Sequence, residues 1–160
     1  MKKIEIICVG KLKEKFLTAA YSEYNKRLSS YCKLTSIELA DEKIAVHASS
    51  KEEEIFKDRE GDRILAKITN NAFVIALAIE GQIMTSPEFA AYLDEIYLRG
   101  ANHVVFVVGG SVGLSSKVLA RANLKLSFSK MTFPHQLFRI MLIEQIYRAF
   151  KISANEVYHK

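Results

Sequence analysis

The sequence predicts a single α/β domain, residues 1–160, in which a mainly parallel β-sheet is flanked by helices. Residues 72–79 (AFVIALAI) and 103–108 (HVVFVV) form continuous, largely apolar runs, which is typical of parallel strands covered by helices on both faces. Strand and helix patterns alternate five times along the chain, without a repeat or a low-complexity linker. The length of 160 residues, with 49% hydrophobic and 26% charged residues, fits one ordinary globular domain.

The first half of the chain contains two strand patterns and two helix patterns. We expect strands over residues 3–9 and 33–39, helices over residues 13–29 and 51–68, and a polar loop over residues 41–50. The first strand ends at Gly10, which suits a turn. Ser49 or Ser50 is expected to cap the second helix, and Gly61 inside that helix predicts a kink or a break.

The second half repeats the alternation. We expect strands over residues 72–79, 103–108 and 125–129, and helices over residues 86–100, 116–123 and 134–152. Ser86 and Pro87 start the first of these helices, because proline fits the first helical turn. Ser115 or Ser116 is expected to cap the short helix that follows the strand 103–108.

The last helix is apolar on almost every side. Pro134 is expected in its first turn, with Ser129 or Thr132 supplying the capping oxygen. A helix of this kind is normally buried between two layers, or between a core and a partner subunit. Glu144 and Arg148 then form either a surface pair four residues apart or a buried functional pair.

Composition limits the classes of function. No apolar run approaches the roughly 20 residues of a membrane-spanning helix, and the first residues resemble a strand rather than a signal peptide. Cys8 and Cys32 are the two cysteines, and neither lies in a CxxC pair, so we expect no zinc site or disulfide framework and a reducing, cytoplasmic location. A net charge of +5 and a pI of about 9.1 permit a nucleic-acid partner without requiring one.

A glycine-rich turn is the first candidate site. Gly109, Gly110 and Gly113 directly follow a buried strand, at the strand end where α/β sheets bind ligands. The spacing matches neither GxGxxG nor a P-loop, and a turn that simply requires positive φ explains the glycines equally well. If the strands are neighbours, this turn converges with Leu77 and with residues 128–133 on one pocket. Such an apolar, backbone-rich pocket suits a flat adenine better than a phosphate.

Three motifs together resemble one protein family. They are FSKMTFPHQLFRIMLIEQIYRAFKI near the C-terminus, VVGGSVGLS around the glycine turn, and the terminal YHK. In this order and in a chain of this size, they resemble the ribosomal RNA large subunit methyltransferase H family of the SPOUT superfamily. The resemblance covers the whole chain and implies a SPOUT α/β-knot fold with a C-terminal trefoil knot, a homodimer, and S-adenosylmethionine bound in the knot. The residues it assigns to the cofactor are Leu77, Gly109, Phe128, Ser129, Lys130, Met131, Thr132 and Phe133.

The resemblance also implies a reaction. The methyl group of S-adenosylmethionine would pass to N3 of a pseudouridine in 23S ribosomal RNA, on the assembled ribosome and without a metal. Because an imide N–H is a weak acid, the site should supply a proton acceptor and positive charge. The candidates for the proton acceptor are Glu144, His159 and His135, with Arg148 and Arg139 as charge stabilisers or phosphate contacts. The resemblance implies that the C-terminal tail completes the site through Tyr158 and His159. We therefore expect Glu144, Arg148, Tyr158 and His159 to be catalytic and His135, Arg139 and Lys160 to contact RNA.

Two other functions stay open on the sequence. One is a SPOUT methyltransferase that acts on tRNA, and the other is a non-catalytic, ribosome-associated RNA-binding protein whose glycine turn is structural. We do not expect the remaining histidines to react. His47 lies in the polar loop and is expected to be solvated, whereas His103 begins a strand and is expected to be packed.

Overall fold

The computed structural model describes residues 1–160 and contains one five-stranded sheet in the order β2-β1-β4-β3-β5, with every pairing parallel. The strands are β1 (Lys2–Val9), β2 (Cys32–Leu39), β3 (Phe73–Ile83), β4 (His103–Val108) and β5 (Leu124–Ser127). The helices are α1 (Lys15–Leu28), α2 (Ser50–Lys67), α3 (Ser86–Leu98), α4 (Ser116–Arg121) and α5 (His135–Ser153). The predicted fold class and the fivefold alternation are confirmed.

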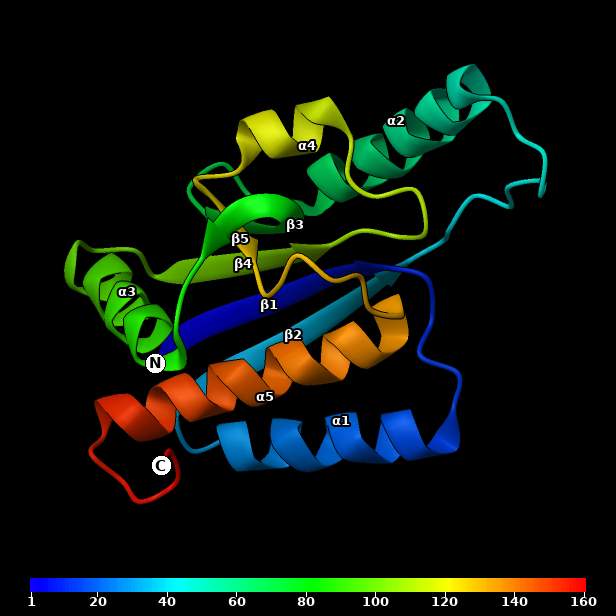
Figure 1. The fold of residues 1–160 in the computed structure, drawn as a ribbon. Helices are drawn as coiled ribbons and strands as arrows, with labels where there is room; N and C mark the ends of the chain where they lie inside the picture. Colours follow the sequence, from blue (N-terminus) through cyan, green and yellow to red (C-terminus); the bar gives the residue numbers. More distant parts are fainter.

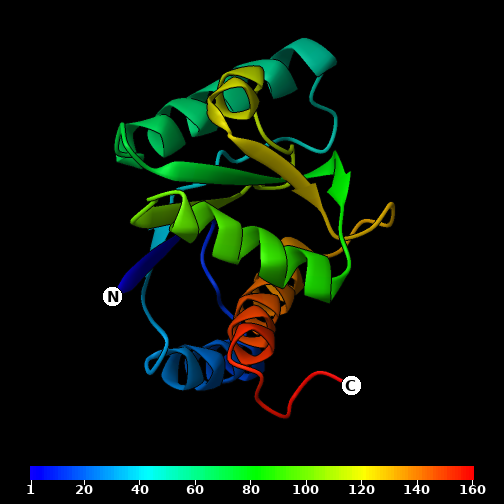
Figure 2. The same ribbon diagram turned by 90° about the vertical axis from the view of Figure 1, so that its left-hand side faces the viewer.

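Helices cover both faces of the sheet. Helices α2 and α4 lie on one face, and α1, α3 and α5 lie on the other (Figures 1 and 2). Strand β4 is apolar from Val104 onward because both of its faces are buried. Val104 and Phe106 belong to the larger core beneath α3 and α5. Val105 and Val107 belong to the smaller core beneath α2 and α4. None of the helices is long and apolar enough to cross a membrane.

Strand β3 runs four residues beyond its expected end and bends around β5. Leu126 is the register partner of Leu77 and again of Gln82, so residues 78–81 form an arch over the β5 backbone. A Cβ atom on Gly81 would lie only 2.7–2.8 Å from backbone atoms of Lys125 and Leu126. Only glycine therefore allows this approach, which the sequence pattern alone did not reveal.

Two expectations about helix structure are wrong. Helix α5 begins at His135 with Pro134 as its N-cap residue, and no side chain caps it. Ser129 instead accepts a hydrogen bond from the Met131 backbone N–H at 3.0 Å, which stabilises the segment before the helix. Helix α2 continues through Gly61 without a break, because this glycine packs against Ser115 rather than marking a kink.

Replacing Gly81 with alanine tests the contact between the β3 arch and β5. We expect Gly81→Ala to lower the free energy of unfolding by about 3 kcal/mol, because the new methyl group meets backbone that cannot move without disturbing the strand pairing. The exposed neighbour supplies the control, and Gln82→Ala should change stability by less than about 0.5 kcal/mol. Urea denaturation measures both values, and equal stability of the two variants would contradict the constraint.

Candidate functional site

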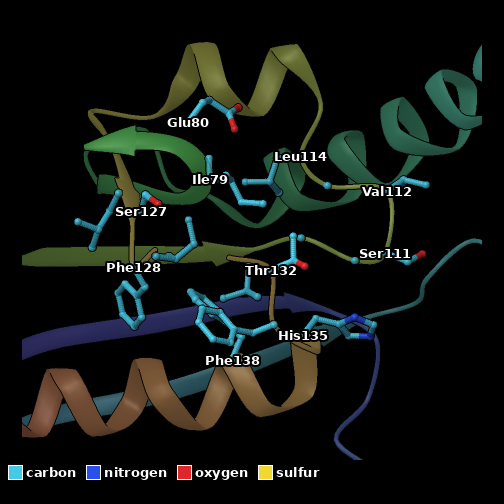
Figure 3. A pocket seen from close by; sticks show the side chains of 18 of the residues that line it. Ile79, Glu80, Ser111, Val112, Leu114, Ser127, Phe128, Thr132, His135 and Phe138 are labelled. Atoms are coloured by element: carbon cyan, nitrogen blue, oxygen red, sulfur yellow. The ribbon is translucent and has the colours of Figure 1, made fainter. Parts of the chain in front are cut away.

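A cavity of about 500 Å³ opens at the carboxyl ends of β4 and β5 and beside the arch in the middle of β3 (Figure 3). Three chain segments form most of its wall, namely residues 77–80, 108–114 and 126–133 without Lys130. The predicted convergence of these three segments is confirmed, since β3 pairs with both β4 and β5 and all three strands run in the same direction.

Seven of the eight residues expected to bind the cofactor line this cavity. They are Leu77, Gly109, Phe128, Ser129, Met131, Thr132 and Phe133, and Lys130 is the exception. Further lining residues were not anticipated, among them Ile79 and Glu80 at the start of the β3 arch and Lys57 from α2. Little in the sequence indicated that these residues line a cavity. Ile79 looks like the last residue of a buried strand, and Lys57 looks like one of many surface cations.

The glycine turn forms one wall of the cavity as a tight loop. The Gly113 N–H donates to the Gly110 carbonyl at 3.1 Å, and Gly113 has a φ of +81°, a conformation that favours glycine. A Cβ on Gly109 would lie 3.0 Å from the Gly113 carbonyl carbon. The turn ends at Ser115, whose hydroxyl accepts a 3.3 Å hydrogen bond from Val118 and so caps α4. The positive φ at Gly113 and the close packing at Gly109 therefore explain why glycines occur in this turn, and the glycines also line the cavity.

Aromatic rings form the opposite wall. Phe138, one turn into α5, lies 4.9 Å from the Phe128 ring and 6.4 Å from the Phe133 ring, measured between centroids. Figure 3 shows Phe128 and Phe138 on the α5 side of the cavity, with Ile79 and Leu114 across from them. Such a wall offers stacking and apolar contact to a flat ring, because aromatic faces prefer offset or tilted neighbours.

A polar cluster surrounds Glu144 in the second half of α5. Glu144 Oε1 accepts hydrogen bonds from Arg148 Nη2 at 2.5 Å and Nε at 3.0 Å, and from the Tyr158 hydroxyl at 3.1 Å. Arg148 Nη1 lies 3.2 Å from Nδ1 of His159. Since arginine only donates, Nδ1 accepts, and the proton of the neutral imidazole ring is on Nε2. This arrangement ties the C-terminal tail to α5.

Burial and charge perturb two members of this cluster. Burial, followed by the nearby Glu144 carboxylate, raises the pKa of Tyr158 to about 12. The hydrogen bond to Glu144 raises the pKa of Arg148 further above its ordinary value. The Tyr158 ring also packs edge-on against Tyr147, with 5.0 Å between centroids, and the Arg148 guanidinium lies 4.8 Å from the Tyr158 ring centroid. Glu144 and Arg148 thus form a partly buried pair, which is intermediate between the surface pair and the buried pair that the sequence allowed.

The tail cluster does not reach the cavity of its own chain. Glu144 lines a second cavity of about 380 Å³, which shares Leu126, Ser127 and Phe128 with the first. Tyr158 and His159 line neither cavity. Helix α5 starts beside the strand ends and runs away from them, so the tail folds back at the far end of the helix (Figure 1).

The three residues expected to contact RNA lie in different environments. His135 lines the first cavity and is exposed, and Lys160 is exposed at the chain end. Arg139 is 3% exposed and donates to Glu38 at 2.6 Å and to the Gly10 carbonyl at 3.0 Å. Burial argues against an RNA contact by Arg139, whose guanidinium instead attaches α5 to the ends of β1 and β2.

The two remaining histidines and the two cysteines line neither cavity. His47 is exposed, and His103 is 8% exposed with the pKa of its ring lowered chiefly by burial. Cys8 and Cys32 are buried free thiols. The structure contains no cluster of three or more His, Cys, Asp or Glu side chains that could hold a metal ion.

Comparison with known proteins finds one matching family and several relatives of nearly the same length. The family described as predicted SPOUT methyltransferase matches residues 1–159. A protein from Clostridium botulinum named ribosomal RNA large subunit methyltransferase H is 60% identical over 157 residues, which cover 98% of this chain and 99% of that protein. Proteins with the same name from Clostridium beijerinckii and Clostridium acetobutylicum are 58% and 57% identical, with the same coverage.

The Glu144–Arg148 pair can be compared with a second pair of the same spacing. We expect Glu144→Gln to lower the free energy of unfolding by about 1–2 kcal/mol, because it removes the charge that pairs with a partly buried guanidinium. Glu23 and Arg27 on α1 form the matched control, since they are also four residues apart but considerably more exposed. Glu23→Gln should cost less than about 0.5 kcal/mol. Thermal unfolding of both variants measures the difference, and equal losses would make the Glu144 pair an ordinary surface pair.

Proposed function

The chain belongs to the SPOUT methyltransferase family, and we propose that it transfers a methyl group from S-adenosylmethionine to N3 of a pseudouridine in 23S ribosomal RNA. The observation that carries the proposal is the cavity at the strand ends, where seven residues expected to bind the cofactor come together. The names of the relatives support large-subunit ribosomal RNA as the substrate. We include the assembled ribosome and a cytoplasmic location in the proposal.

The lining of the cavity fits the proposed methyl donor. Phe128, Phe133 and Phe138 offer an aromatic wall for the adenine ring, and the backbone of residues 109–113 offers polar groups opposite it. A volume of about 500 Å³ lies within the range of small-molecule sites. S-adenosylmethionine, when bound, supplies an electrophilic methyl group on a sulfonium. We also propose that the segment from β5 to α5 passes through the trefoil knot implied by the family resemblance.

The polar cluster suits the proton and charge requirements of the reaction. The N3 proton of the base must leave as the methyl group arrives, and His159 accepts it at Nδ1, the ring nitrogen without a proton, once the base takes the place of the Arg148 hydrogen bond. Before the base binds, Arg148 holds that imidazole through Nδ1, and its guanidinium supplies positive charge next to the developing anion. Glu144 and the Tyr158 hydroxyl hold Arg148 and the tail, so we assign them positioning roles. His135 and Lys160 remain the proposed RNA contacts.

We further propose a homodimer in which the tail of one subunit completes the cavity of the other. The support is that Tyr158, His159 and Lys160 line neither cavity of their own chain. Much of α5 is nevertheless buried by its own chain, and its exposed apolar residue Leu137, at 42%, lies near the cavity end of the helix. A symmetric contact through this region would bring two copies of the site together.

Filling the cavity should block donor binding without unfolding the protein. Ile79 is 51% exposed and lines the cavity, so we expect Ile79→Trp to weaken binding of S-adenosylmethionine at least tenfold in calorimetry. Ile83 is the matched control, because it is 55% exposed on the same strand and lines neither cavity. Ile83→Trp should bind the donor as the original protein does. Equal affinities for both variants would place the donor elsewhere.

Transfer of label from S-adenosylmethionine tests the substrate. We expect label in ribosomes that contain pseudouridine, and none in ribosomes that lack it, because N3 methylation requires that base. Free 23S RNA and tRNA serve as comparison substrates. Label in tRNA would favour a tRNA methyltransferase on the same fold. An absence of label together with an absence of donor binding would favour a ribosome-associated binding protein and contradict the proposal.

A further inference from the structure

Glu60 is the most deeply buried acidic side chain of the protein. It lies on α2, a helix that is otherwise mostly exposed, and only 3% of its surface is accessible. A carboxyl group is rarely buried to this extent unless its hydrogen bonds are satisfied. Its environment therefore calls for a specific explanation, which the proposed methyl transfer does not provide.

The two oxygens of Glu60 face different loops. Oε2 accepts a hydrogen bond from the backbone N–H of Glu42 at 2.8 Å, which fixes the chain just after β2. Oε1 is buried without a hydrogen-bond partner and faces the glycine turn, since a Cβ on Gly110 would lie 3.4 Å from it. Gly110 in turn lines the donor cavity. One side chain thus bridges the segment around Glu42 and the cavity wall.

Gly61, the next residue of α2, lies against the other end of the glycine turn, at Ser115. A Cβ on Gly61 would overlap the Ser115 hydroxyl, so glycine is required for this hydroxyl to cap α4. Glu60 therefore lies against the start of the segment 110–115, and Gly61 against its end. Neighbouring residues of one helix define where both ends of the glycine turn lie.

Charge does not account for the placement of Glu60. Burial raises the pKa of its carboxyl group, opposed by the hydrogen bond from Glu42 and by the positive charge of Arg63. Arg63 is itself directed elsewhere, because it donates to the Ala40 carbonyl at 2.6 Å and pairs with the Glu42 carboxylate. The surroundings therefore use the fit of the carboxyl group against Gly110 and its hydrogen bond from the Glu42 N–H.

We propose that Glu60 is a positioning residue for the methyl-donor cavity, holding the glycine turn at Gly110 and connecting it to the chain around Glu42. The part of this inference that concerns the donor rests on the proposed function. The part that concerns the turn rests only on the position of Glu60 beside Gly110 and on its hydrogen bond from Glu42. The two parts have separate measurements.

The experiment uses three variants of the full-length protein. Glu60→Met keeps the length of the side chain but removes its hydrogen-bonding groups, and it fills the same volume so that the core is not emptied. Glu60→Gln keeps both the shape and an acceptor for the Glu42 N–H. Asp62→Asn is the control, because Asp62 is an exposed carboxylate on the same helix. Thermal unfolding and the exchange of β4 core amides verify that each variant is folded.

Amide hydrogen exchange in the donor-free protein tests the turn. We expect residues 110–114 to exchange at least tenfold faster in Glu60→Met, and within about twofold of the original protein in Glu60→Gln and Asp62→Asn. Unchanged exchange in Glu60→Met would overturn the proposal. An equal acceleration in Glu60→Gln would overturn it as well. This variant keeps the shape of the side chain and the acceptor for the Glu42 N–H, so these two properties would then not be what holds the turn.

Calorimetry with S-adenosylmethionine tests the consequence for the donor. We expect at least tenfold weaker binding in Glu60→Met and nearly unchanged binding in the other two variants. Equal affinity of Glu60→Met and the original protein would overturn the role in donor binding. If the original protein bound no donor, the proposed function would fail, while the exchange measurement would still decide whether Glu60 holds the turn.

Discussion

The close approach of the β3 arch to the β5 backbone is the constraint on which the candidate site depends. Because Gly81 lets the two backbones touch, β3 pairs with β5 on both sides of the arch, and residues 78–80 turn towards the cavity. The end of β5 is then held beside the ends of β3 and β4. Without this contact, the segment 128–133 would lack its position opposite the glycine turn, and the three cavity walls would not meet.

The fold could be predicted largely because the burial of a parallel sheet leaves a clear pattern. After His103, strand β4 has alternate residues in each of two cores, so every one of these positions is apolar, and the predicted and observed bounds of the strand agree. The cavity wall could also be predicted, since residues at the carboxyl ends of neighbouring parallel strands must lie together. The cofactor residues themselves came from the family resemblance, which periodicity alone does not supply.

What the sequence did not reveal depends on contacts between distant residues. Arg139 looks like a surface cation on a helix, and only the fold shows that Glu38 and the Gly10 carbonyl surround it. Gly61 looks like a helix breaker until Ser115 is packed against it. Glu60 lies in a helix of mostly exposed charges, where nothing local distinguishes it. In each case the partner is far away along the chain, beyond the reach of propensity or periodicity.

The distances along α5 bear on how many chains form the complete site. His135 lies at the cavity, and Glu144 follows nine residues later on the same helix, which corresponds to about 14 Å along the axis. The tail is attached to Glu144 and Arg148 by hydrogen bonds from side chains that are partly buried. A proton acceptor must come within hydrogen-bond reach of the reacting base. Moving His159 to the cavity of its own chain would break both bonds, whereas in the proposed homodimer a second subunit presents its tail with the bond from Tyr158 to Glu144 intact. The ordered tail on α5 therefore supports the proposed sharing of the site between subunits, because it keeps His159 away from the cavity of its own chain.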